Sequence, residues 1–222
     1  MLDPRLRTAV RGQVTQVETL NDLALGHFDA VTTVQQAFRD CIIGLGVAEA
    51  ADGEIVAVDG QVWRIPADGR PVVASPGLGL PFAVTAAGGT SLSAPLPPGS
   101  TFEDITVTVD ALRGPVSGGS TVVAVRIDGS FTDVVLRSEP RQQPPYQMLS
   151  HVLEHEVRFR FTAWTGTLAG FRFADDSDGT AIPGLHLHAI SSDRASGGHC
   201  HQATVASARL TAWVDDVRFV AH

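Results

Sequence analysis

Residues Gly184–Gln202 read GLHLHAISSDRASGGHCHQ and hold four of the eight histidines of this 222-residue chain. In an extended strand, alternate side chains point to opposite faces. His186 and His188 then share one face of a predicted strand over 184–190, while Leu187 faces the other way. The glycines at 197 and 198 allow a tight backbone approach or a positive φ directly before His199. The stretch therefore predicts a strand with two imidazoles on one face and a third imidazole brought near them.

The segments on either side of this stretch also have strand periodicity. The turn sequences ADGE and VDGQ separate the apolar runs CIIGLGVAEA, EIVAVDG and QVWRI. Further strands are predicted from TFEDITVTVDAL (101–112), STVVAVRIDGSF (120–131), TDVVLRSE (132–139), VRFRFTAWTG (157–166), LAGFRFA (168–174) and HQATVASARLTAWV (201–214).

Helices are expected in two places. Apolar residues from 14 to 40 follow helical spacing, which predicts two short helices broken near Gly26, and PPYQMLSHVLEH (144–155) predicts a helix after a proline pair. Residues 66–100 are expected to be loop with one strand at 81–85. The fold class is therefore α+β and β-dominated, with mixed or antiparallel sheets. We expect one unit over 1–222, with an α/β part over about 1–100 and a β part over about 101–222 that carries the histidines.

Composition excludes several classes of partner. The net charge of −8 argues against the clustered cations that nucleic acid requires, and the apolar runs are too short to span a membrane. The opening MLDPRLRTAVRG has no signal-peptide core, and Cys41 and Cys200 do not make a disulfide framework. We expect a cytoplasmic protein that binds neither nucleic acid nor membrane.

The basic residues limit the chemistry. All 16 are arginine, so no lysine can form a Schiff base with a carbonyl substrate. Three neutral imidazoles suit Zn, Fe, Ni, Co or Mn and leave coordination positions open for a substrate. The alternative is that His186 and His188 are partly exposed strand residues and that His199 is a polar loop residue. Cys200 and His201 are interpreted as structural.

Several blocks of the chain, in order, resemble the α-acetolactate decarboxylase family. PGLHLHAISSDRASGGH is similar to its histidine motif, and AVRIDGSFTDVVLRSEPRQQPPYQML to its central signature. LALGHFDAVTTVQQAF, GLGVAEAADGEIVAVDGQVWRI and WTGTLAGFRFAD are similar to further family segments. The resemblance implies the family's fold, a homodimer, and decarboxylation of the keto acid 2-acetolactate to acetoin and CO2. It also implies a divalent metal, for which we expect Zn²⁺.

The same resemblance implies residue roles. His186, His188 and His199 would be the metal ligands. Glu54 would act as general acid or base, and Arg137 would hold the departing carboxylate through its planar fork of donors.

Two departures from the family pattern leave alternatives open. Val47 stands where the family has a hydroxyl, and the family's second glutamate, from a C-terminal extension, has no counterpart after Glu156. Asp215, Asp216 or the carboxylate of His222 could replace it. A metal-dependent lyase, isomerase or cyclase acting on another keto acid, or a binding protein without catalysis, would show the same pattern.

Overall fold

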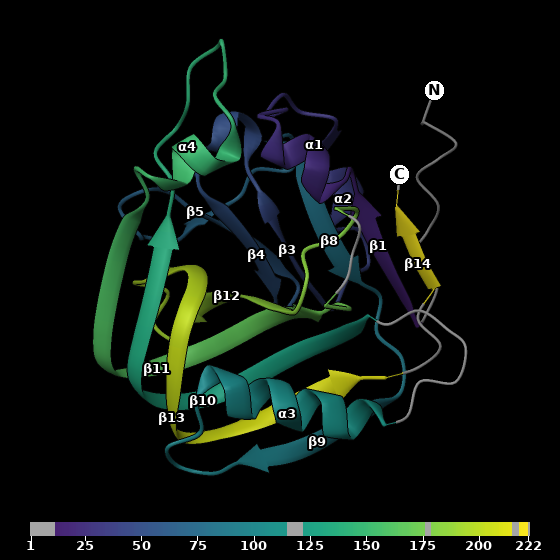
Figure 1. Ribbon diagram of the computed structural model, residues 1–222, viewed down its shortest axis with the longest axis vertical. Coiled ribbons are helices and arrows are strands. Elements are labelled where there is room, and N and C mark those ends of the chain that lie inside the picture. Colours follow the sequence, from purple (N-terminus) through teal and green to yellow (C-terminus); the bar gives the residue numbers. More distant parts are fainter. Residues whose placement is uncertain (1–11, 115–121, 176–178, 215–217, 222) are drawn as a thin grey trace.

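Two β-sheets form the frame of the molecule, one mainly from the N-terminal and one mainly from the C-terminal part of the chain (Figure 1). The computed structural model describes residues 12–114, 122–175, 179–214 and 218–221. Strands dominate this part of the chain and pair mainly in the antiparallel sense. The predicted β-dominated α+β class is confirmed.

The N-terminal sheet has seven strands in the order β14-β1-β8-β3-β4-β5-β6. Their bounds are β1 (Gln13–Val17), β3 (Ile43–Val47), β4 (Glu54–Val58), β5 (Gln61–Ile65), β6 (Val72–Val73), β8 (Phe82–Ala86) and β14 (Arg218–Ala221). A small separate pair is formed by β2 (Thr32–Thr33) and β7 (Gly79–Leu80). The strands predicted from the three apolar runs of 41–65 correspond to β3, β4 and β5, which are neighbours in the sheet.

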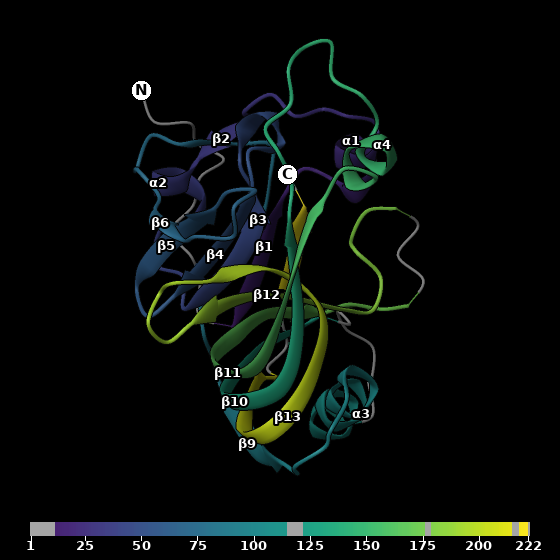
Figure 2. The same ribbon diagram turned by 90° about the vertical axis from the view of Figure 1, so that its left-hand side faces the viewer.

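The C-terminal sheet is built from unusually long strands. Its order is β10-β11-β12-β13-β9, and β10 also pairs with β13, so the long strands curl round on themselves (Figure 2). The bounds are β9 (Ser91–Leu96), β10 (Val123–Ser138), β11 (Val157–Arg172), β12 (Leu185–Ser191) and β13 (Gly197–Trp213). Two pairs of predicted strands thus merge into β10 and β11.

The prediction of a strand over 101–112 is wrong, because α3 (Phe102–Arg113) occupies this segment. Thr101 and Asp104 form a capping box, in which each side chain accepts a hydrogen bond from the other's backbone N–H. The alternating β-branched residues suggested a strand, but Ile105 is fully buried whereas Val107 is 63% exposed. The buried face recurs at helical spacing, and it packs against the C-terminal sheet.

The N-terminal helices are shorter than predicted. Residues 13–17 form β1, in which alternate side chains are buried, and not the first part of a helix. The two helices that do form, α1 (Leu20–Ala24) and α2 (Val34–Ala37), lie on either side of Gly26, which has a φ of 84°. A single-turn 3₁₀ helix, η1 (Glu49–Ala51), precedes β4, and α4 (Leu149–Leu153) confirms the helix predicted in 144–155.

Residues 66–100 contain more strand than expected. The predicted strand at 81–85 corresponds to β8, but β6, β7 and β9 also form in this region. Pro95 is tolerated in β9 because this strand lies at the end of the five-stranded order, where one side needs no ladder hydrogen bonds.

The two sheets share one apolar core, which fixes their relative position. Ile43 and Val56 of the N-terminal sheet belong to the same buried cluster as Phe171 and Ile190 of the C-terminal sheet. A second cluster lies between the C-terminal sheet and α3. Residues at the junction of the sheets are therefore held by packing from both sides.

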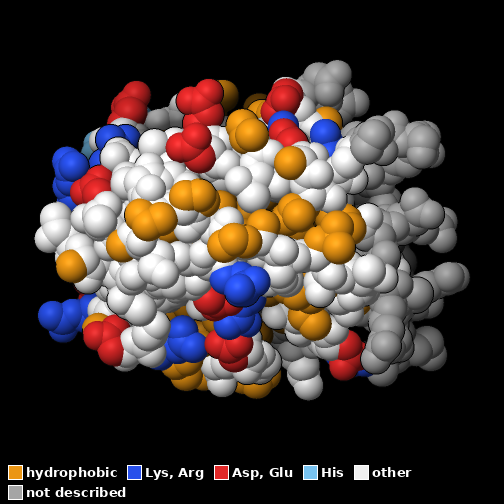
Figure 3. All heavy atoms as spheres, turned by 90° about the horizontal axis from the view of Figure 1, so that it is seen from below, with side chains coloured by type: hydrophobic (Ala, Val, Ile, Leu, Met, Phe, Trp, Pro, Cys, Tyr) orange, Lys and Arg blue, Asp and Glu red, His pale blue; other side chains and the backbone are white. Residues whose placement is uncertain are grey.

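The face seen from below in Figure 1 carries a band of apolar side chains (Figure 3). The lowest elements in Figure 1, α3 and β9, carry the exposed apolar residues Val107 and Leu92. Among the described residues, no helix has the length and apolar character needed to cross a membrane.

Candidate metal centre

Three histidines converge where β12 and β13 meet. His186 and His188 lie on the same face of β12, and His199 of β13 pairs directly with His188. The ring centroids of His186 and His199 are 4.5 Å apart, and those of His188 and His199 are 5.5 Å apart. One ligand-type nitrogen from each of the three lies within 4.8 Å of the others. The structure thus brings together the three residues that the sequence singled out.

Glycine at position 198 makes this convergence possible. Its φ is 142°, and a Cβ there would lie 2.4 Å from the carbonyl oxygen of Arg137. A larger residue would push β13 away from β10 and take His199 with it. The glycine pair in the sequence therefore allows the close approach that was predicted for it.

The tautomer of His188 is set by the backbone of the other sheet. His188 Nδ1 lies 2.7 Å from the carbonyl oxygen of Ile55, which can only accept, so Nδ1 donates. In the neutral ring, Nε2 then carries a lone pair. Nε2 lies 3.2 Å from His186 Nε2 and 3.3 Å from Glu54 Oε2. The lone pair on His188 Nε2 therefore faces the Glu54 carboxylate, and a proton or a metal cation between them would relieve their repulsion.

Burial keeps the three imidazoles neutral. It lowers the pKa of His186 and of His199 well below the ordinary value of 6.5, and neighbouring histidines and Arg137 lower both further. Burial also lowers the pKa of His188, against the opposing effects of the Glu54 charge and the Ile55 hydrogen bond. The neutral ring is the form that binds metals.

Glu54 and Arg137 reach the histidines from different sheets. Glu54 opens β4 and its side chain is only 2% exposed, while Arg137 lies near the end of β10. Arg137 Nη1 is 3.0 Å from Glu54 Oε1, whose partner oxygen faces His188. The two residues implied as catalytic therefore lie together beside the histidine triad.

Two carboxylates at this site were missed by sequence reasoning. Glu139 contacts Arg137 Nη1, and Glu156 Oε2 lies 3.1 Å from Arg137 Nε. By formal charge, these three carboxylates exceed the guanidinium groups of Arg137 and Arg158 by one negative charge, and a cation at the histidines would offset it. Glu139 could have been found, because residues two apart on a strand share a face. Glu156 lies just before β11, and no pattern in the sequence predicts that it lies close to Arg137.

The donor set fits a divalent metal ion. Three neutral imidazoles are typical ligands of Zn²⁺ and related ions. His199 Nδ1 is buried and makes no hydrogen bond, and Nε2 of His188 faces an acceptor, Glu54 Oε2. His188 has the outer-shell hydrogen bond to a carbonyl that commonly orients a metal-binding histidine. His186, His188 and His199 would therefore hold the ion.

The other residues considered from the sequence lie as follows. Val47 pairs with Glu54 across β3 and β4 and so presents its apolar side chain on the same face. Cys200 is buried in the core under α3, where the Sγ donates to Gln202. His201 points instead toward Glu156, at 3.2 Å. Asp215, Asp216 and His222 lie outside the described residues.

A second group with metal-ligand chemistry lies at the surface. His151, Glu154 and His155 of the α4 segment have ligand atoms within 4.8 Å of one another, but all three residues are exposed. Exposed groups of this kind need no metal, because water can satisfy their polar atoms. The triad, in which His188 is buried and His186 and His199 are only partly exposed, is the better candidate.

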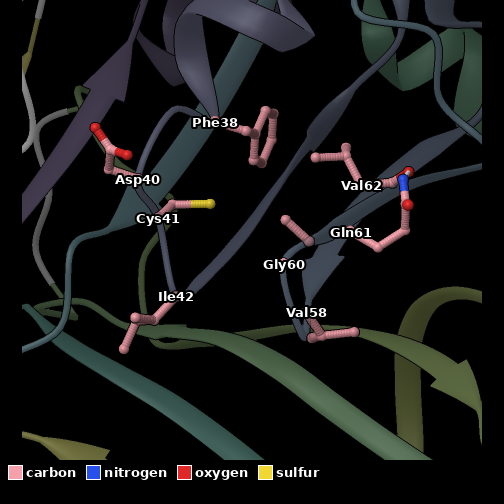
Figure 4. A pocket seen from close by; sticks show the side chains of 9 residues that line it. Phe38, Asp40, Cys41, Ile42, Val58, Gly60, Gln61 and Val62 are labelled. Atoms are coloured by element: carbon pink, nitrogen blue, oxygen red, sulfur yellow. Dashed lines mark hydrogen bonds between the residues drawn. The ribbon is translucent and has the colours of Figure 1, made fainter.

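A hollow of ≈ 200 Å³ lies elsewhere, between the start of β3 and the β4–β5 turn (Figure 4). Phe38, Val58 and Val62 line it, and the Cys41 thiol points into it. Burial raises the pKa of Cys41 to about 12, so the thiol stays protonated and unreactive at neutral pH. The hollow contains none of the histidines and has no part in the metal centre.

Comparison with known sequences relates this chain to one family of enzymes. A sequence model of the α-acetolactate decarboxylase family matches residues 14–217. The α-acetolactate decarboxylase of Methanosarcina mazei is 32% identical over 184 residues, covering 83% of this chain and 63% of that protein. The one from Klebsiella aerogenes is 31% identical over 198 residues, covering 89% of this chain and 75% of that protein. This chain thus spans less than two thirds of the M. mazei relative's length.

Solved structures agree with the sequence comparison. The crystal structure of the Bacillus subtilis α-acetolactate decarboxylase superposes with a TM-score of 0.85 at 25% identity, covering 94% of this chain and 88% of the other. A Staphylococcus aureus protein described as similar to that enzyme superposes with a TM-score of 0.87 at 22% identity, which shows a shared fold. The chain belongs to the α-acetolactate decarboxylase family.

Proposed function

We propose that the protein is a metal-dependent carboxy-lyase that converts 2-acetolactate to acetoin and CO2. The observation that carries the proposal is the triad of converging imidazoles with the buried side chains of Glu54 and Arg137 beside it. The ligand atoms of His186, His188 and His199 lie within 4.8 Å of one another, and Glu54 Oε2 is 3.3 Å from His188. The names of the relatives support acetolactate as the substrate.

Decarboxylation needs an electron sink for the pair left on the substrate and a proton donor. When the bond between the carboxylate and its carbon breaks, the electron pair stays on the substrate and CO2 leaves. A divalent cation, when bound, supplies a Lewis acid for the negative charge that develops on the ketone oxygen. We propose Zn²⁺, with Fe, Ni, Co and Mn as further candidates for three imidazoles.

Glu54 is proposed to deliver the proton that replaces the lost carboxylate. Its carboxyl group is buried, lies beside a metal-binding imidazole and contacts Arg137, so it is within reach of a substrate on the metal. Arg137 is proposed to hold the carboxylate of the substrate until it departs. Its side chain is 10% exposed, so its charge is poorly screened by water.

Three finer expectations belong to the same proposal. Acetoin biosynthesis is the proposed role, the cytoplasm the proposed compartment, and a homodimer the proposed assembly. The family resemblance supports the role and the dimer, and a small-molecule keto acid is the proposed partner.

The test is product analysis with purified, metal-loaded protein. Racemic acetolactate should give acetoin and CO2, His186→Ala should abolish this turnover, and Glu54→Gln should reduce it strongly. Protein with stoichiometric metal that yields no acetoin would reject the proposal. The ethyl homologue of acetolactate, offered in parallel, separates an enzyme for another keto acid from a protein that binds metal without catalysis.

A further inference from the structure

The buried carboxylate of Glu156 lies beside the candidate metal centre, and the proposed function assigns it no role. Its side chain is 7% exposed, and its two oxygens have different partners. Oε2 lies 3.1 Å from Arg137 Nε. Oε1 contacts Arg158 Nε and lies 3.2 Å from His201 Nε2. Glu156 therefore joins the buried guanidinium to two cationic or titratable groups nearer the surface.

The register of the C-terminal sheet explains why a carboxylate is needed here. Arg137 of β10 pairs directly with Arg158 of β11. Two like charges directly opposite each other on neighbouring strands repel. Glu156, one residue before β11 begins, contacts the Nε atoms of both arginines. It balances the pair and draws the Nε edge of Arg137 toward itself.

The three carboxylates around Arg137 contact two different nitrogen atoms of its guanidinium. The closest contacts of Glu54 and Glu139 fall on Nη1, whereas that of Glu156 falls on Nε. The contact at Nε is an ion pair without hydrogen-bond geometry, and the charge of Glu156 favours the orientation in which this edge of the planar guanidinium faces it. Arg158, with a side chain 66% exposed, anchors Glu156 from the solvent side. Glu156 is thus the only one of the three that holds Arg137 by this edge among the described residues.

We propose that Glu156 is a positioning residue that orients Arg137, so that Nη1 faces Glu54 and the metal-bound substrate. This inference rests on the proposed function for its catalytic consequence. Glu156 itself touches neither the three histidine ligands nor, in this account, the substrate. Its removal lets the guanidinium rotate and misplaces the group that holds the substrate carboxylate.

The kinetic test uses Glu156→Gln, which keeps the side-chain volume, and Glu154→Gln as a control in the same segment. We expect kcat/KM for acetolactate to fall about 10- to 100-fold in Glu156→Gln, with metal content unchanged, as for other outer-shell partners. Glu154→Gln should behave as the wild type, because its side chain is 68% exposed. Wild-type kinetics in Glu156→Gln would overturn the proposal.

A double-mutant cycle asks whether Glu156 acts through Arg137. In an Arg137→Lys background, Glu156→Gln should cause little further loss, since the edge that it holds is already gone. Equal losses in the two backgrounds would show that Glu156 acts by another route and would overturn the proposal.

An NMR signal of Arg137 tests the positioning role of Glu156 without relying on catalytic turnover. The Nε–Hε signal of Arg137 in a ¹H–¹⁵N spectrum, assigned by its disappearance in Arg137→Lys, should move and exchange faster with solvent in Glu156→Gln. It should stay unchanged in Glu154→Gln. If the wild type makes no acetoin, the proposed function fails but this spectrum still decides the inference. An unmoved Arg137 signal in Glu156→Gln would contradict it.

Discussion

The hydrogen bond from His188 Nδ1 to Ile55 determines which ring nitrogen is free to bind a cation. Because the carbonyl can only accept, Nε2 is left unprotonated in the neutral ring. The same bond links β12 to β4, so the orientation of this proposed metal ligand depends on the packing of the two sheets. A single tautomer thus connects the fold to the chemistry of the site.

The depressed pKa values of the histidines predict a pH dependence for the metal-free protein. An unfolded histidine takes up a proton near pH 6.5, whereas buried His186 and His199 resist it until much lower pH. The unfolded state therefore binds more protons below that value, and stability falls as the pH drops below about 6.5. Urea unfolding of the protein after removal of metal by a chelator, measured between pH 7.5 and 5.5, gives the change of unfolding free energy with pH.

A matched variant identifies the origin of the slope. In His199→Gln, the free energy of unfolding should depend less steeply on pH over the same range, because one depressed group is gone. A slope identical to that of the wild type would show that other groups cause it.

Arginine at position 137 should not be replaceable by lysine. Lysine keeps the charge but loses the planar fork that contacts Glu54 and Glu156 at different nitrogens. We expect Arg137→Lys to retain its metal and to lower kcat by about 100-fold, the scale of a misplaced catalytic group. Steady-state kinetics together with elemental analysis measures both. Unchanged kinetics would mean that Arg137 is only structural.

At the scale of the element, α3 is a helix formed by a run of β-branched residues whose alternation predicted a strand. Ile105 is 0% exposed and Val107 is 63% exposed, although a strand would put them on one face. We expect Ile105→Ala to cost about 2–5 kcal/mol of unfolding free energy. Val107→Ala should change it by less than about 0.5 kcal/mol. Similar costs for the two variants in urea unfolding would contradict the helix.

The elements that sequence predicted well are those whose periodicity and turn residues agree. The alternation in 184–190 predicts β12 and the shared face of His186 and His188, and the DGE and DGQ turns predict β4 and β5. The strand predicted over 101–112 failed because the decisive signal was the capping box of Thr101 and Asp104, not the periodicity. Local capping overrode strand propensity there.

The site was predictable only in part, for a related reason. Strand alternation and the glycine pair singled out the three histidines, the family resemblance supplied Glu54 and Arg137, and the structure brings them together. Glu156 depends on the β10–β11 register, which pairs Arg137 with Arg158 over a long loop and helix. Such pairing between distant segments follows from the packing of the whole sheet and cannot be derived from the residues nearby.

At the scale of the molecule, the candidate metal centre lies where the two sheets meet. His186, His188 and His199 come from the C-terminal sheet, while Glu54 and the Ile55 carbonyl come from the N-terminal sheet. A bound cation would therefore add to the cohesion between the halves of the chain. Its effect should be visible as stability of the folded state, because the unfolded chain lacks the site.

Removal of the metal should lower stability by mass action. At a free metal concentration 100 times the dissociation constant, one site stabilises the native state by about 2.7 kcal/mol. Chelation should therefore lower the midpoint of thermal unfolding of the wild type and leave that of His188→Ala unchanged. A chelator that lowers both midpoints equally would locate the stabilising ion elsewhere, and His155→Ala tests the surface group on the α4 segment.

The most direct test of the central claim is X-ray absorption spectroscopy of the zinc-loaded protein at one zinc per chain. We predict three imidazole nitrogens at about 2.0–2.1 Å, with this signature lost in His188→Ala and kept in His155→Ala. A spectrum with fewer than two imidazoles, or one that His188→Ala does not alter, would contradict it.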